Sequence, residues 1–128
     1  MDGEIQSMKV LHIIGGSLNG GAAKGAFSLH KGLLKNDVDS KILVQLGKNQ
    51  DRILSLSDDH IGRIKQTLIS RFNQSKLFKY PQRQKQIFSV PYHGNPITKT
   101  KAYKWADIIN LHWINGGMMS LDELSKID

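Results

Sequence analysis

The sequence predicts an α/β fold in which a Rossmann-like, doubly wound parallel sheet has helices on both faces. Two observations lead to this prediction. A strand, a glycine loop, a helix and a second strand follow one another between Lys9 and Gln45, and a further buried strand occurs at Asp107–Leu111. A strand–helix–strand unit of about 30 residues joins parallel strands by a right-handed connection. We therefore expect the strand order 3-2-1-4.

The first elements are defined by a change in apolar spacing. Lys9–Ile14 is a continuous apolar run rich in β-branched residues, as is typical of a strand buried on both faces. Four glycines lie between positions 15 and 21, and apolar residues then recur at helical spacing from Ala22 to Lys35. Asn36 and Asp37 end this helix, and Ser40–Gln45 is the second strand.

The middle of the chain predicts one helix and one short strand. Residues 47–57 are polar and lack strong periodicity, so we expect a loop there. A helix begins at Asp58 or Asp59, and its apolar side chains share one face: Ile61, Ile64, Leu68 and Phe72. Two interpretations of these four residues stay open: they pack onto the sheet, or they contact a membrane surface. Ile87–Val90 is a candidate strand that ends at Pro91.

The C-terminal part predicts a fourth strand and a last helix. Asp107–Leu111 is the strand, and His112 and Trp113 follow it directly. Ser120, with Glu123 three positions later, forms a capping-box pattern. A helix is therefore expected from Ser120 through Ile127.

Composition is that of an ordinary globular chain. With 128 residues, of which 39% are hydrophobic, we expect one domain covering residues 1–128. The sequence contains no run of 18 apolar residues, and its acidic N-terminus differs from a secretory signal, so we expect a cytoplasmic protein. The chain has no Cys, which excludes disulfides, thiolate metal sites and Cys nucleophiles.

The net charge of +7 is concentrated in one segment. Between His60 and Trp105 there are ten Lys or Arg residues and no Asp or Glu, whereas acidic residues outnumber basic ones in the remainder. Such a segment attracts anions, including lipid head groups, nucleic acids and phosphorylated substrates.

The glycine loop is a candidate anion site. It has the glycine spacing of a P-loop without the Lys-Ser or Lys-Thr pair that follows it, and it has no dinucleotide-binding register. What remains is the close approach of backbone amides and the positive end of the following helix. Gly20, Gly21 and Ala22 are thus the candidate residues for binding a phosphate or sugar phosphate. The alternative is that these glycines only make a turn.

His112 is the second candidate. It follows the fourth strand, and in the order 3-2-1-4 it lies beside the glycine loop, at the edge where doubly wound sheets bind ligands. The alternative is a packed or solvated histidine. For Trp113 we favour packing in the core over stacking on a substrate. No spacing of histidines or acidic residues resembles a metal site, so we expect neither metal nor cofactor.

Three segments resemble a known family. Met8–Ile14, Gly20–Ala23 and Asp107–Gly116, in this order, look like the N-terminal domain of bacterial family 4 retaining glycosyltransferases of the GT-B type. The closest resemblance is to members that act in surface-polysaccharide assembly.

The resemblance implies the N-terminal half of a GT-B fold in a two-domain enzyme that needs no metal. This enzyme transfers a sugar from a nucleotide-sugar donor to a glycan or lipid-linked acceptor. Gly20, Gly21 and Ala22 match the loop that approaches the donor phosphates, and His112 matches the histidine that faces the transferred sugar. The second, nucleotide-binding domain would lie beyond Asp128, so we expect this fragment to be inactive alone. Its expected place is the cytoplasm, at the inner face of the plasma membrane where the acceptor is lipid-linked.

Three other functions are alternatives to the glycosyltransferase. The basic segment contains aromatic residues that would suit single-stranded nucleic acid, but no nucleic-acid-binding signature accompanies them, so we expect no nucleic-acid partner. An oxidoreductase is disfavoured because Gln45 stands where an acidic residue would bind the ribose. A scaffold role for a Rossmann-like module is the third.

Overall fold

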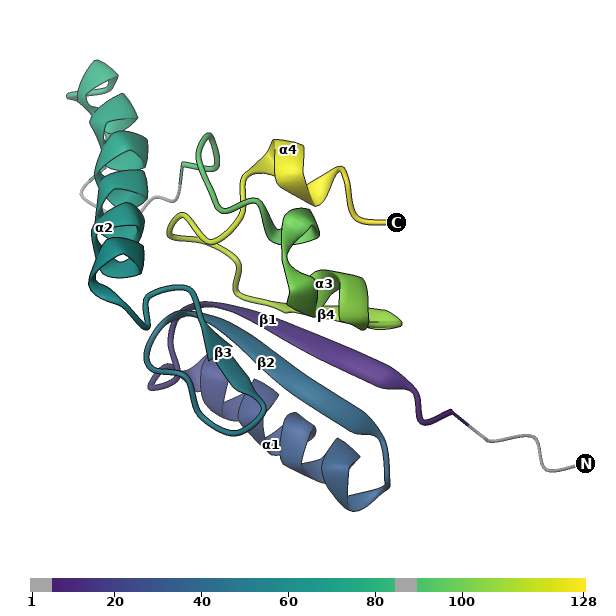
Figure 1. Ribbon diagram of the computed structural model, residues 1–128. Coiled ribbons are helices and arrows are strands. Elements are labelled where there is room, and N and C mark those ends of the chain that lie inside the picture. Colours follow the sequence, from purple (N-terminus) through teal and green to yellow (C-terminus); the bar gives the residue numbers. More distant parts are fainter. Residues whose placement is uncertain (1–5, 85–89) are drawn as a thin grey trace, which may run out of the picture.

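The computed structural model describes residues 6–84 and 90–128. It contains a four-stranded sheet with the order β3-β2-β1-β4, in which all strands are parallel (Figure 1). The strands are β1 (Lys9–Ser17), β2 (Asp39–Leu46), β3 (Ile53–Ser55) and β4 (Ile108–His112). The predicted α/β class and strand order are confirmed.

Helices cover both faces of this sheet. The α-helices are α1 (Gly21–Lys35), α2 (His60–Ser75), α3 (Lys101–Trp105) and α4 (Leu121–Leu124), and two 3₁₀ turns are η1 (Lys76–Lys79) and η2 (Ile97–Lys99). Figure 1 shows α1 on one side of the sheet and α3 and α4 on the other. The arrangement is the doubly wound one that the sequence predicted.

The core is divided between the two faces because strand side chains alternate. On the α1 face, Ala23 and Ala26 pack with Ile14, Ile42 and Val44. On the opposite face, the buried cluster contains Leu11, Ile13, Leu43, Ile97 and Met118. Burial on both faces explains why β1 and β2 read as continuous apolar runs.

The expectation of a loop throughout residues 47–57 is wrong for Ile53–Ser55, which form β3. Ile53 is buried and pairs with Ile42, while Ile42 N donates a hydrogen bond of 2.9 Å to Arg52 O. Three residues are too few to show alternation in a sequence, so this edge strand is defined by pairing with β2. The candidate strand at Ile87–Val90 falls mainly on residues 85–89, outside the described residues.

The start of α2 is as predicted, but the proposed packing of its apolar face is wrong. Asp59 caps the helix by accepting a 2.6 Å hydrogen bond from Gly62 N. The four apolar side chains are exposed by 48–78% of their surface: Ile61, Ile64, Leu68 and Phe72. The helix is instead attached through polar residues, and in Figure 1 it projects away from the sheet. Its buried side chains are Gln66 and Asn73.

The last helix is shorter than expected. Ser120 caps it, as predicted, by accepting a 3.1 Å hydrogen bond from Glu123 N. The Glu123 carboxylate does not complete a capping box; it accepts 2.7 Å hydrogen bonds from the N and Oγ1 of Thr98. α4 ends at Leu124, and the Glu123 carboxylate joins it to η2.

No helix in the described ranges is both long enough and apolar enough to cross a bilayer.

Candidate functional site at the carboxyl edge of the sheet

The glycine loop and His112 meet at the carboxyl ends of β1 and β4. Ile14 of β1 is paired with His112 of β4, and Gly15 N donates a 3.0 Å hydrogen bond to Trp113 O. The two segments that the sequence singled out, almost a hundred residues apart, are thus direct neighbours. This edge is where a doubly wound sheet binds ligands.

Two glycines are required here by the shape of the backbone. A Cβ atom on Gly15 would lie 2.5 Å from Trp113 O and 2.7 Å from Asn115 O, which is closer than any side chain tolerates. Gly16 has a φ of +74°, a conformation that costs other residues strain. Gly16 N donates a 2.9 Å hydrogen bond to Gln45 Oε1, which holds the loop against β2. The loop therefore has a fixed geometry.

The N-terminus of α1 presents backbone amides with little steric cover. Gly20 is the capping residue, in an extended conformation and without a side-chain cap, and the helix begins at Gly21. The first amides of an α-helix have no partner within the helix and carry partial positive charge. A Cβ on Gly20 or Gly21 would meet no heavy atom within 4 Å, so the space at their side-chain positions is open. The three predicted residues Gly20, Gly21 and Ala22 line a small cavity of about 240 Å³.

A larger cleft adjoins this cavity. Its volume is about 630 Å³, and it lies between the glycine loop, the end of β2 and α2. Its lining includes Gly16, Gly20, Gln45, Arg71 and Trp113. Arg71 was missed as a site residue, since nothing in the sequence distinguishes it from the other cations of the basic segment; its place on α2 brings it to the cleft. The cleft thus combines open amides with one guanidinium.

Trp113 lies in the site and not in the core, so the expectation of core packing is wrong. Its side chain is 67% exposed, and it lines both cavities. Its φ is +44°, a left-handed conformation that costs a non-glycine residue about 1–3 kcal/mol. The hydrogen bond from Gly15 N fixes its carbonyl in this conformation. The exposed indole of Trp113 offers a flat surface to a ligand.

His112 is partly buried and belongs to a chain of polar side chains that crosses the α1 face of the sheet. Its Nε2 lies 3.2 Å from Nδ1 of His12, which is fully buried. His12 Nε2 lies 3.1 Å from Ser40 Oγ, and that hydroxyl lies 2.7 Å from Nδ1 of His30 on α1. His112 lines neither cavity; it precedes Trp113, which lines both, and it stands at the end of this chain of hydrogen bonds.

The donor and acceptor roles in this chain are assigned from the contacts of His12 Nδ1. The amide Nδ2 of Asn110 lies 3.4 Å from His12 Nδ1, and an amide nitrogen only donates. We assign the single lone pair of His12 Nδ1 as the acceptor of the closer bond, which Nε2–H of His112 donates at 3.2 Å; the 3.4 Å contact with Asn110 shares that lone pair and is the weaker of the two. His12 Nε2–H in turn donates to Ser40, whose hydroxyl donates to His30. This assignment leaves Nδ1 of His112 as an acceptor.

Burial keeps these imidazoles neutral. Desolvation, followed by the proximity of His112 and His30, lowers the pKa of His12 to about 4. Desolvation also lowers the pKa of His112 from its ordinary value. For His30, desolvation and then the charge of Arg52 lower the pKa. A neutral His112 suits hydrogen bonding to a hydroxyl group better than ion pairing with a phosphate.

Within residues 6–84 and 90–128, no group of three or more His, Asp or Glu side chains is arranged to hold a metal ion.

No family model, curated protein or solved structure matches this chain. The fold and the site define a Rossmann-like α/β protein with a glycine loop, an open helix N-terminus and a neutral histidine at one sheet edge.

Proposed function

We propose that this chain is the N-terminal, acceptor-side domain of a family 4 retaining glycosyltransferase of the GT-B type. The enzyme would transfer a sugar from a nucleotide-sugar donor to a glycan or lipid-linked acceptor in cell-surface polysaccharide biosynthesis. The observation that supports this most strongly is the pairing of Ile14 with His112, because it joins the glycine loop and the histidine of the resemblance at one ligand-binding edge.

The glycine loop supplies the electrostatic part of this chemistry. When the bond from the sugar to the donor phosphate breaks, negative charge develops on the departing phosphate. Preorganised amides at the N-terminus of α1, at Gly21 and Ala22, stabilise that charge without moving a proton. Arg71, across the cleft, adds a full positive charge.

His112 supplies positioning near the transferred sugar. Its Nδ1 accepts a hydrogen bond from a sugar hydroxyl, while its Nε2–H stays bonded to His12. The exposed ring of Trp113, which lines both cavities, packs against a sugar or base. The nucleotide itself is held by a second Rossmann-like domain, as the resemblance implies.

The reading frame beyond codon 128 gives the first test, and it should encode that second domain. The protein from the complete frame is then incubated with a panel of uridine- and guanosine-diphosphate sugars, with and without a lipid extract as acceptor. We expect acceptor-dependent release of nucleoside diphosphate from at least one donor, with retention at the anomeric carbon. A stop codon directly after Asp128, or no release from any donor, would argue against the proposal.

A further inference from the structure

We propose that the outer face of α2 and η1 is a docking surface for an anionic lipid bilayer. This outer face consists of the exposed apolar residues of α2 with Phe78 and Tyr80 beyond it: Ile61, Ile64, Leu68, Phe72, Phe78 and Tyr80. The proposal stands on the polarity and charge of this helix and does not depend on the glycosyltransferase assignment.

The polarity of α2 is the reverse of that of a helix on a protein core. Its buried contacts are polar: Gln66 Nε2 donates a 2.8 Å hydrogen bond to Asn95 Oδ1, and Gln66 Oε1 accepts a 3.2 Å bond from Gln45. Asn73 is bonded through both amide atoms to the backbone of His93, at 2.8 Å each. An amphipathic surface helix ordinarily turns its apolar side inward. Here the polar side attaches the helix, and the apolar side is exposed.

The four exposed apolar residues of α2 share one face of the helix. Ile61, Ile64, Leu68 and Phe72 follow the three- and four-residue spacing of one helix face, with 78%, 59%, 48% and 60% of their surface exposed. Phe78 and Tyr80, which follow the helix in the sequence, are also exposed, at 82% and 66%. Contiguous exposed apolar surface marks an interaction site.

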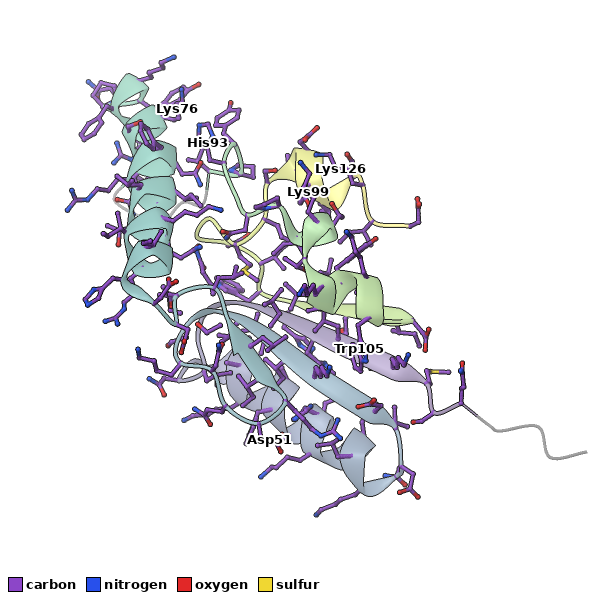
Figure 2. The ribbon with its side chains drawn as sticks, in the orientation of Figure 1. Asp51, Lys76, His93, Lys99, Trp105 and Lys126 are labelled. Carbon is purple, nitrogen blue, oxygen red and sulfur yellow. The ribbon has the colours of Figure 1, made fainter. Side chains whose placement is uncertain are left out.

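The charges around this face select an anionic bilayer over a protein groove. Residues 60–84 contain six cations and no Asp or Glu: Arg63, Lys65, Arg71, Lys76, Lys79 and Arg83. Lys65 lies four residues from Ile61, and Arg71 three residues from Leu68, so a cation flanks the apolar residues on either side. Long cationic stems place their charges at the level of lipid phosphates while the apolar residues enter the acyl boundary. Figure 2 shows Lys76 at the far end of α2. Phe78 and Tyr80 follow it in the sequence, and exposed aromatic residues of this kind suit a lipid interface.

Docking in this way also orients the cleft. Arg71 flanks the outer face and lines the 630 Å³ cleft, so the cleft opens next to the lipid surface. If the proposed function holds, a lipid-linked acceptor reaches the glycine loop directly from the bilayer. This orientation, unlike the docking itself, depends on the proposed function.

Vesicle flotation tests the docking. The 128-residue chain is mixed with vesicles of phosphatidylcholine alone or of phosphatidylcholine with phosphatidylglycerol, and the floated protein is measured. We expect recovery with the anionic vesicles to be about tenfold higher than with the neutral ones and to fall as salt is added, since each surface cation adds to the attraction.

Matched variants separate the outer face from the rest of the surface. Leu68→Ser with Phe72→Ser should abolish flotation, whereas Leu29→Ser with Leu121→Ser, at exposed apolar positions on α1 and α4, should leave it intact. Lys65→Ser with Lys79→Ser should weaken it severalfold, and Lys24→Ser with Lys35→Ser should not. All four proteins should keep the thermal unfolding profile of the parent, because the substituted side chains are exposed.

Several results would overturn the proposal. Equal recovery with neutral and anionic vesicles would do so, as would an equal loss in the control variants. A dimer in light scattering that Leu68→Ser with Phe72→Ser dissociates would assign the face to a second copy of the chain. Binding of a single-stranded oligonucleotide that needs the same two residues would assign it to nucleic acid. Flotation as expected from an enzyme that releases no nucleoside diphosphate would count against the proposed function alone.

Discussion

His112 Nε2 lies 3.2 Å from Nδ1 of His12, so two imidazoles a hundred residues apart share one hydrogen bond. A bond between two neutral imidazoles needs one ring to donate and the other to accept. The tautomer of the partly exposed ring is therefore set by the buried one, and His12 is fixed through Ser40 to α1. The sheet thus determines which nitrogen of His112 is available to a ligand.

The first prediction concerns this tautomer. Nitrogen-15 NMR of the histidine rings should show His12, His30 and His112 each as the single tautomer protonated at Nε2, because the assigned bonds run from His112 Nε2–H through His12 and Ser40 to His30 Nδ1. The exposed His60, which lies outside this chain of hydrogen bonds, provides the control signal in the same spectrum. Protonation of His112 at Nδ1 would reverse the whole chain and refute the assignment.

A second prediction concerns stability and pH. The pKa of His12 is lowered to about 4 in the folded chain, so between that value and its ordinary 6.5 the unfolded chain binds more protons. Stability is then fully present above pH 6.5 and falls as the pH drops toward 4, by about 3 kcal/mol from His12 alone. The lowered pKa values of His30 and His112 act in the same direction.

Urea unfolding between pH 7.5 and 4.5 measures this dependence on the parent chain and on His12→Asn. The variant should lose stability less steeply over that range, even if it is less stable at neutral pH. Identical slopes for the two proteins would show that His12 does not titrate as described.

The third prediction concerns two glycines: Gly21, whose missing side chain leaves the amides accessible, and Gly15, whose missing side chain lets the backbone pack closely. Gly21→Val should leave the fold nearly unchanged, since a Cβ there meets nothing within 4 Å, yet it should lower donor turnover about 10²-fold by blocking approach to the amides. Gly25→Val, on the same helix and also in open space, is the matched control and should retain turnover.

Gly15→Ala should act on the fold instead. Its Cβ would press on the carbonyls of Trp113 and Asn115, so thermal unfolding should shift downward by an amount equivalent to about 2 kcal/mol or more. If Gly21→Val has the turnover of Gly25→Val, the loop only makes a turn.

The sequence predicts the parts of the fold that local patterns specify. The apolar run of β1, the helical spacing of α1 and the caps Asp59 and Ser120 all have local causes, and all were found. The proximity of the glycine loop to His112 was also predicted correctly, because parallel connections restrict the strand order.

Two of the features that were missed depend on pairing across the sheet, and two depend on contacts or backbone conformation outside it. β3 is too short to show a pattern, and the contact of His12 with His112 becomes visible only when His12 is known to pair with Asn110. Packing on the sheet stayed open as one of two interpretations of the apolar residues of α2, because the hydrogen bonds of Gln66 and Asn73 cannot be inferred from spacing. For Trp113, a left-handed backbone turns the ring into the site.

The central claim is that the carboxyl edge of β1 and β4 is a sugar-transfer site. The most direct test compares His112→Ala with the parent, both expressed from the complete reading frame, in acceptor-dependent release of nucleoside diphosphate. We expect kcat to fall about 10²-fold or more with little change in the KM for donor, because the proposed function places His112 at the transferred sugar and the nucleotide in the second domain. His60→Ala, a histidine outside the site, should retain the parent rate. An unchanged kcat and KM in His112→Ala would contradict the account and leave this histidine a structural residue.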